Sequence, residues 1–109
     1  MKSYEHVKDK RYFNKIIKEG KTLRNKHFVI CYLKSENYNY KIGIAVSTKL
    51  GHAFYRNKLK RQIRNIVTDN KFLFKNYNDY IIILTRACIN EKYEVLNIEL
   101  KKIIEKIGE

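Results

Sequence analysis

The fold is decided between residues 41 and 84, where the sequence reads KIGIAVSTKLGHAFYRNKLKRQIRNIVTDNKFLFKNYNDYIIIL. At its start, Lys41–Ser47 alternates larger apolar residues with small ones, and this alternation predicts a β-strand. At its end, Asp79–Leu84 contains the continuous run YIIIL, which is typical of a strand covered on both faces and therefore central in its sheet. Between the two strands, Arg56–Val67 repeats apolar residues at helical spacing. The residues on that apolar arc are Leu59, Ile63, Ile66 and Val67. The segment therefore predicts a β-α-β unit.

The sequence before this unit predicts one helix and one strand. Lys8–Glu19 carries its apolar residues on one side, which predicts a short basic amphipathic helix that ends at Gly20. Phe28–Leu33 predicts a strand, and the polar stretch Lys34–Tyr40 predicts the turn after it. We expect a single α+β domain over residues 1–109. Its mixed β-sheet should have about four strands packed by three helices, in the order α-β-β-β-α-β-α.

The C-terminal segment predicts the last helix. Asn90 is a candidate N-cap, Glu91 and Glu94 would lie in the first turn, where the helix dipole favours anions, and Gly108 would end the helix. Its apolar residues share one stripe, which predicts a face docked on the core, although a helix that binds a partner would show the same stripe. These residues are Tyr93, Leu96, Leu100, Ile103, Ile104 and Ile107.

The charge of the chain predicts a polyanionic partner. There are 24 Lys and Arg against 11 Asp and Glu, a net charge of +13, and the positive excess lies entirely within residues 1–90 because the last 19 residues carry five acids and four bases. Such an excess favours binding to nucleic acid first and to an anionic membrane surface second. A membrane-surface helix needs large exposed apolar residues opposite its cations, whereas the apolar residues of these helices are needed for the core.

The positive charge is densest in Lys49–Arg64, which contains six bases and no acid. On the predicted helix, Asn57 and the cations Lys60, Arg61 and Arg64 lie opposite the apolar arc. Arginine offers a planar fork for bidentate phosphate contacts and lysine a point charge, so this face suits a sugar-phosphate backbone. A solvated basic face is the alternative, but no acid is interleaved to form pairs one turn apart.

These residues resemble a known family. A VSxKxGxA turn is followed by an RNxxKRxxR helix, and this combination is similar to the bacterial ribonuclease P protein component. The turn residues are Val46, Ser47, Lys49, Gly51 and Ala53, and the helix residues are Arg56, Asn57, Lys60, Arg61 and Arg64. The resemblance covers nearly the whole chain. It also includes Phe13, Lys15 and Gly20 in the first helix, the strand Phe28–Tyr32 and the strand Asp79–Ile83.

The resemblance implies the protein subunit of a ribonucleoprotein endonuclease that removes the 5′ leader of precursor tRNA. It implies two partners, the ribonuclease P RNA and precursor tRNA. We expect no membrane partner and infer no obligate protein partner. The RNA subunit would perform the hydrolysis with Mg²⁺ held mainly by RNA and substrate, so the protein would contribute no catalytic residue and no metal ligand. The family also implies a left-handed β-α-β crossover, and we expect a cytoplasmic protein.

The resemblance further implies two RNA-binding surfaces. The helix that contacts the RNA subunit would use Arg56, Asn57, Lys58, Lys60, Arg61 and Arg64. A cleft between the first helix and the sheet would hold the leader with Phe13, Lys15, Ile17, Phe28, Ser47, Lys49 and Arg86. The family commonly has aromatic residues where this chain has Ile17 and Cys31, which implies a more hydrophobic cleft that depends less on stacking. Core packing is the alternative role of Phe13 and Phe28.

The sequence does not favour a nuclease that acts without RNA. His6, His27 and His52 fall in different predicted elements, and no paired-carboxylate or nucleophile motif is present. Of the three, His52 lies in the basic turn and is the one candidate for RNA contact. Cys31 and Cys88 lie in apolar contexts without CxxC spacing, which predicts buried, reduced thiols. The alternative function is a structural RNA-binding protein, such as a small ribosomal protein, which would need no substrate cleft.

Overall fold

The computed structural model describes residues 6–35, 40–74 and 77–107. Its main elements are α1 (Lys10–Glu19), β1 (Lys21–Arg24), β2 (Phe28–Lys34), β3 (Ile42–Ala45), α2 (Ala53–Asp69), β4 (Asn78–Leu84) and α3 (Tyr93–Ile107). Within these residues, the 3₁₀ turns η2 (Thr48–Leu50), η3 (Lys71–Leu73) and η4 (Arg86–Cys88) lie between the main elements. The predicted α+β class and the order α-β-β-β-α-β-α are confirmed.

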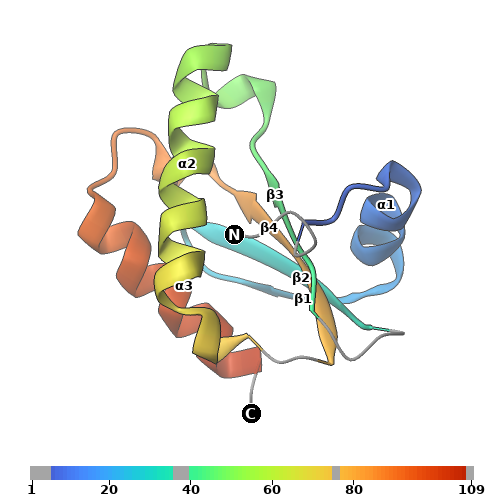
Figure 1. Cartoon of the computed structure of the whole chain (residues 1–109). Coiled ribbons are helices and arrows are strands. Elements are labelled where there is room, and N and C mark those ends of the chain that lie inside the picture. The colour runs from blue at the N-terminus through green and yellow to red at the C-terminus, as the bar shows by residue number, and fades with distance from the viewer. Residues whose placement is uncertain (1–5, 36–39, 75–76, 108–109) are drawn as a thin grey trace.

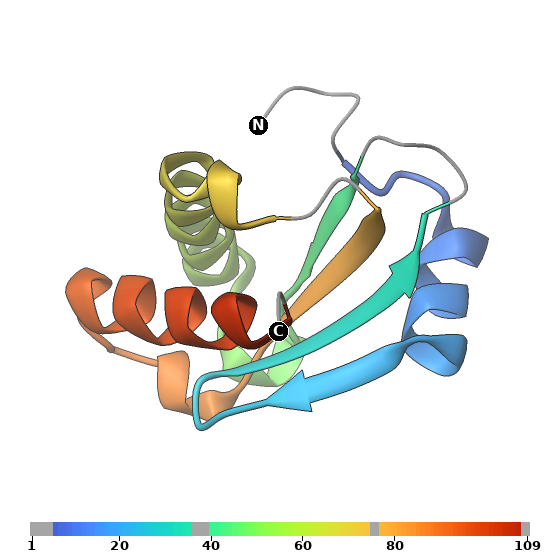
Figure 2. The same cartoon turned by 90° about the horizontal axis from the view of Figure 1, so that it is seen from below.

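The four strands form one mixed sheet in the order β1-β2-β4-β3. β2 pairs antiparallel with both β1 and β4, whereas β3 pairs parallel with β4. The predicted central position of β4 is therefore confirmed, and α2 is the crossover that joins the parallel pair. α1 packs on one face of the sheet, and α2 and α3 pack on the other (Figures 1 and 2).

β4 separates two apolar clusters because its side chains alternate between the faces of the sheet. Tyr80, Ile82 and Leu84 join the larger cluster beneath α2 and α3, whereas Ile81 joins the smaller one beneath α1. The predicted apolar arc of α2 is buried as expected. On α3 the residues Leu96, Leu100, Ile103 and Ile104 are buried, so this helix docks on the core.

A buried carboxylate holds α1 against the sheet. Asp79 is 3% exposed; one of its oxygens accepts a hydrogen bond from the Tyr12 hydroxyl, and the other accepts from the Lys41 N–H at 2.8 Å. A buried acid needs such donors because its charge loses hydration. At the helix ends, Asp9 caps the N-terminus and Gly20 allows close passage of the chain, since a Cβ on Gly20 would lie 2.5 Å from the Tyr32 carbonyl oxygen.

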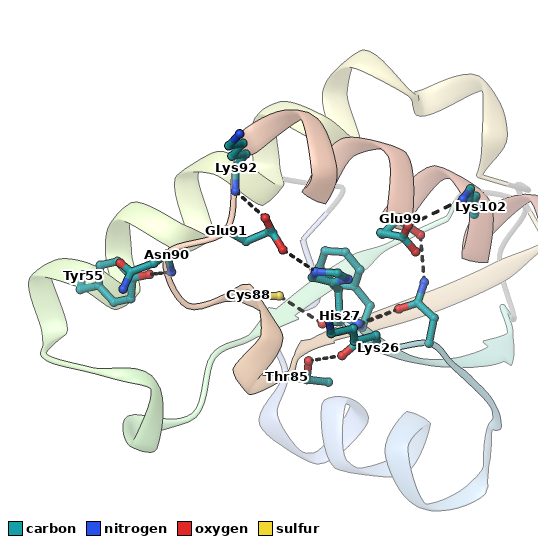
Figure 3. Close-up of polar contacts among 12 residues, drawn as sticks. Lys26, His27, Tyr55, Thr85, Cys88, Asn90, Glu91, Lys92, Glu99 and Lys102 are labelled. Atoms are coloured by element: carbon teal, nitrogen blue, oxygen red, sulfur yellow. Dashed lines mark hydrogen bonds and ion pairs between the residues drawn. The ribbon is translucent and has the colours of Figure 1, made fainter.

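The structure corrects the predicted start of α3. Asn90 is not the N-cap: its φ of 58° is left-handed, and its N–H donates to the Tyr55 hydroxyl. The helix begins at Tyr93, so Glu94 lies in the first turn as predicted but Glu91 does not. Glu91 instead accepts from the Lys92 N–H and pairs with His27 (Figure 3). The predicted end at Gly108 lies outside the described residues.

The contacts of Glu91 tie the start of α3 to the turn before β2. Glu91 Oε2 lies 3.0 Å from Nε2 of the buried His27, and this hydrogen bond, with a second from the Lys92 N–H, lowers the pKa of the Glu91 carboxyl. The Cys88 thiol donates to the His27 carbonyl oxygen at 3.1 Å, and burial raises the pKa of Cys88 to about 11 (Figure 3). Both cysteines are free and buried, as expected.

The sequence pattern did not predict where β1 lies. The boundaries of several other elements differ by a few residues from those predicted. Only Leu23 of β1 turns toward the core, so this exposed edge strand carries almost no apolar signal. α2 begins earlier than predicted and α1 later, and β3 is shorter than predicted. Most of the predicted turn Lys34–Tyr40 lies outside the described residues.

Substitution of two adjacent isoleucines in α1 tests how this helix packs on the sheet. Ile16 is fully buried against the sheet, whereas Ile17 is 39% exposed. Ile16→Ala should lower the free energy of unfolding by about 2–4 kcal/mol, because the truncation leaves a cavity. Ile17→Ala should change it by less than about 1 kcal/mol, since alanine's helix propensity offsets the lost contact. Urea unfolding followed by circular dichroism measures both, and equal losses would contradict this packing.

Candidate nucleic-acid interface

The turn before α2 has a conformation that its sequence explains. The Ser47 hydroxyl accepts a hydrogen bond from the Lys49 N–H at 3.2 Å, and the buried Leu50 anchors the turn in the core. Gly51 has a φ of 141°, which side-chain-bearing residues rarely adopt. The Arg56 guanidinium donates through Nε to the Gly51 carbonyl oxygen at 3.2 Å. The glycine and the arginine of the motif therefore fix the start of α2 together.

The basic face of α2, defined as Arg56, Asn57, Lys58, Lys60, Arg61 and Arg64, points away from the core. Arg56 and Lys60 are half-buried and the other four residues are exposed. Within the described part of the chain, none of these five cations has an acidic partner within ion-pair distance. Like charges without acids between them leave a positive potential that phosphates can neutralise.

The face of the sheet beneath α1 carries an apolar strip beside the helix. Strand register aligns Val29, Ile83 and Ala45 across β2, β4 and β3, and all three are half-buried. The neighbouring row, which includes Cys31 and Ile81, is buried beneath α1. We call Val29, Ile83 and Ala45 the apolar strip.

On α1, Phe13 is half-buried and Ile17, one turn later, is exposed. Lys15 is exposed. A Cβ on Gly43 would lie 2.8 Å from the Phe13 ring, so this glycine lets Phe13 lie against β3. Phe13 and Ile17 thus flank the sheet face that α1 leaves partly open.

The structure corrects the assignment of Phe28 to a leader cleft. Phe28 is fully buried in the larger cluster, on the face of the sheet opposite α1. The remaining predicted residues lie at one edge of the sheet: Ser47 and Lys49 follow β3, and Arg86 follows β4. Because β3 and β4 are parallel neighbours, their carboxyl ends lie side by side, and all three side chains are exposed.

A cavity of about 130 Å³ brings the two predicted surfaces together at the edge of β3. Lys60 and Arg64 of α2 line it together with Phe13 of α1. The other lining residues are His6, Val7, Ile42, Gly43 and Ile44. Sequence reasoning missed His6, Val7 and Gly43 because they join the site only through the pairing of residue 6 with Ile42 and the docking of α1. Cations of the basic face and an aromatic ring therefore share one site.

The histidines are separated in space as well as in sequence. His27 is buried beside Glu91, His52 is exposed at the N-cap of α2, and His6 lines the cavity. Among residues 6–35, 40–74 and 77–107, no three His, Cys, Asp or Glu side chains are grouped as metal ligands would be. In the same ranges, no helix has the length and apolar character that a membrane crossing requires.

Comparison with known proteins gives the family. The model of the ribonuclease P family, described as "Ribonuclease P", matches residues 1–108. The chain belongs to the ribonuclease P protein family. It is 34% identical to the ribonuclease P protein component of Streptococcus agalactiae over 99% of this chain and 98% of that protein. The identity is also 34% with the component from Bacillus cereus, over 99% of this chain and 95% of the relative.

Solved structures of ribonuclease P proteins share the fold. The protein from Thermotoga maritima aligns with a TM-score of 0.86 and 30% identity, over 94% of this chain and 96% of that chain. The protein from Staphylococcus aureus aligns with a TM-score of 0.85 and 28% identity, over 96% and 95%. As a ribonuclease P protein, the chain is a subunit of an endoribonuclease whose other component is ribonuclease P RNA.

Proposed function

We propose that the chain binds ribonuclease P RNA through the basic face of α2 and holds the 5′ leader of precursor tRNA against α1 and the apolar strip. The observation that carries this proposal is the cavity at the edge of β3, where Lys60 and Arg64 meet Phe13. An RNA strand leaving the basic face passes directly onto the α1 side of the sheet. One small domain can therefore contact two RNA ligands at once.

The basic face suits the RNA subunit because its cations are fixed on a rigid helix. Arg61 and Arg64 are exposed, while Arg56 is held by the Gly51 carbonyl. Binding would neutralise phosphates and release their counterions, and this release makes affinity depend steeply on salt. Phosphate contacts position the protein on its RNA without reading sequence.

The α1 side suits a single-stranded leader because it combines apolar side chains with nearby cations. Phe13 offers a ring, and Ile17 and the apolar strip add aliphatic surface. Lys49 and Arg86 are exposed and available to backbone phosphates. Lys15 is also exposed, but helical spacing turns it away from the Phe13 side of α1. Proteins that hold single strands combine cations with stacking rings in this way. Since Cys31 is buried and Ile17 has no ring, stacking on this side rests mainly on Phe13.

The same proposal assigns the chemistry to RNA. The RNA subunit, with Mg²⁺ bound mainly by RNA and substrate, hydrolyses the phosphodiester bond, and the protein positions the leader. We also propose that no further protein is obligatory for this role and that the β3-α2-β4 crossover is left-handed, as the family resemblance implies. The cytoplasmic location stays a prediction.

Reconstitution tests the proposal as a whole. Mixing the full chain with a bacterial ribonuclease P RNA and a precursor tRNA at low Mg²⁺ should increase the rate of leader removal over RNA alone, because the protein supplies leader contacts. Gel analysis of the 5′ product measures the rate, and protein without RNA serves as the control. An unchanged rate, or cleavage by the protein alone, would refute the proposal.

Arg61→Ala tests the basic face. It should weaken binding to the RNA subunit and reduce the slope of log K against log salt by roughly one, because one phosphate contact is lost. Lys101→Ala is the matched control, since it removes the same charge from an exposed position on α3 and should leave the slope unchanged. Filter binding over a salt series measures both, and equal slopes for the two variants would show that the face is only solvated.

Phe13→Ala tests the leader side. The holoenzyme should lose about tenfold in affinity for precursor tRNA and none for mature tRNA, because only the precursor has a leader to stack on the ring. Ile98→Ala, an exposed truncation on α3, is the control and should change neither affinity. Thermal unfolding of the free protein checks that the variant is folded. Equal losses for both tRNAs would assign Phe13 to packing.

A further inference from the structure

The solvent-facing side of α2 carries an aromatic residue that the fold does not use. Phe54 is 85% exposed, the highest value among the exposed large hydrophobic residues in the described part of the chain. It belongs to the first turn of α2, two residues before the arginine that opens the RNxxKRxxR motif. Tyr55, its neighbour, packs against the core and accepts a hydrogen bond from the Asn90 N–H. Two adjacent aromatic rings thus differ completely in environment.

Phe54 lies opposite the buried arc of α2. Helical spacing places Lys58, Arg61 and Asn65 in line with it, four, seven and eleven residues further on, and all three are exposed. The buried residues Leu59, Ile63, Ile66 and Val67 are on the other side. A ring at the N-terminal end of a polar face contributes nothing to core packing, and phenylalanine is a weaker helix former than alanine or lysine. Folding therefore does not account for it.

The charge around Phe54 identifies the class of partner. From Lys49 to Thr68 the chain contains cations and neutral residues but no acid. An acidic or neutral protein surface would need donors and acceptors in register with these cations, whereas RNA presents phosphates at regular intervals and flat bases beside them. Every base has a face on which a ring can stack, and arginine and lysine nearby hold the backbone.

We propose that Phe54 stacks on an unpaired base of ribonuclease P RNA and extends the basic face by a non-electrostatic contact. This inference rests on the proposed function, because it places the RNA subunit on α2. The stack would form at the N-terminal end of the helix, while Lys58 and Arg61 contact phosphates further along the same line. The affinity for the RNA would then have two contributions. Salt would weaken the phosphate contacts and would have little effect on the base stack.

The test compares substitutions of Phe54 in the full chain. Phe54→Ala should weaken binding to ribonuclease P RNA about tenfold without changing the slope of log K against log salt, because no cation is lost. Phe54→Tyr should bind like the parent, and Phe54→Leu should bind like the alanine variant, because leucine has no ring. Phe72→Ala is the matched control, since Phe72 is 72% exposed but lies in η3, outside the basic face. It should bind like the parent.

A spectroscopic signature supplies an independent readout. The chain has no tryptophan, so Phe54→Trp introduces a single one, whose fluorescence should be quenched when a base stacks on it. Unchanged affinity of Phe54→Ala, parental affinity of Phe54→Leu, or unquenched tryptophan fluorescence of Phe54→Trp in the complex would each overturn the inference. Failure of the parent chain to bind the RNA would instead refute the proposed function, so the two failures are distinguishable.

Discussion

The structure depends on β4, a strand buried on both faces. Tyr80, Ile82 and Leu84 point into the cluster beneath α2 and α3, while Ile81 is buried beneath α1. A strand in this position must be apolar almost throughout, because helices pack against both of its faces and only Ile83, of its isoleucines, is half-buried rather than buried. It also pairs with a strand on each side, antiparallel to β2 and parallel to β3. Both helical layers are therefore fixed by one seven-residue strand.

The parallel pairing of β3 with β4 sets the position of the RNA-binding residues. It brings the ends of both strands to the same edge of the sheet, which places Lys49 near the segment that contains Arg86. It also makes α2 the crossover helix, so its apolar arc must dock on the sheet and its basic face must point outward. The cations are thus presented on an element that the core holds rigidly, which limits the entropy lost on binding.

Polar contacts hold the two ends of the domain in register. Asp79 joins α1 to β4 and to the residue before β3, and His27 with Glu91 joins the turn before β2 to the start of α3. Each pairs groups far apart in sequence. Both carboxylate oxygens of the buried Asp79 accept hydrogen bonds, whereas the buried His27 ring uses Nε2 and leaves Nδ1 without a partner among the described residues. Such contacts favour one arrangement over its alternatives, because any other packing would leave more of these groups unpaired. Placement of α1, and with it of Phe13, depends on the first of these contacts.

The sequence by itself determined the strands and helix of the β-α-β unit, the apolar arc and basic face of α2, and the apolar stripe of α3, because each follows from periodicity within one element. It also indicated the family through the turn and helix motif. Only the tertiary structure decided that Phe28 is core and that Asn90 is a left-handed turn residue rather than a cap. It likewise revealed β1 and the cavity where Lys60 and Arg64 meet Phe13. These features depend on which face of a strand is covered and on contacts between distant segments. Local sequence patterns predict neither of these.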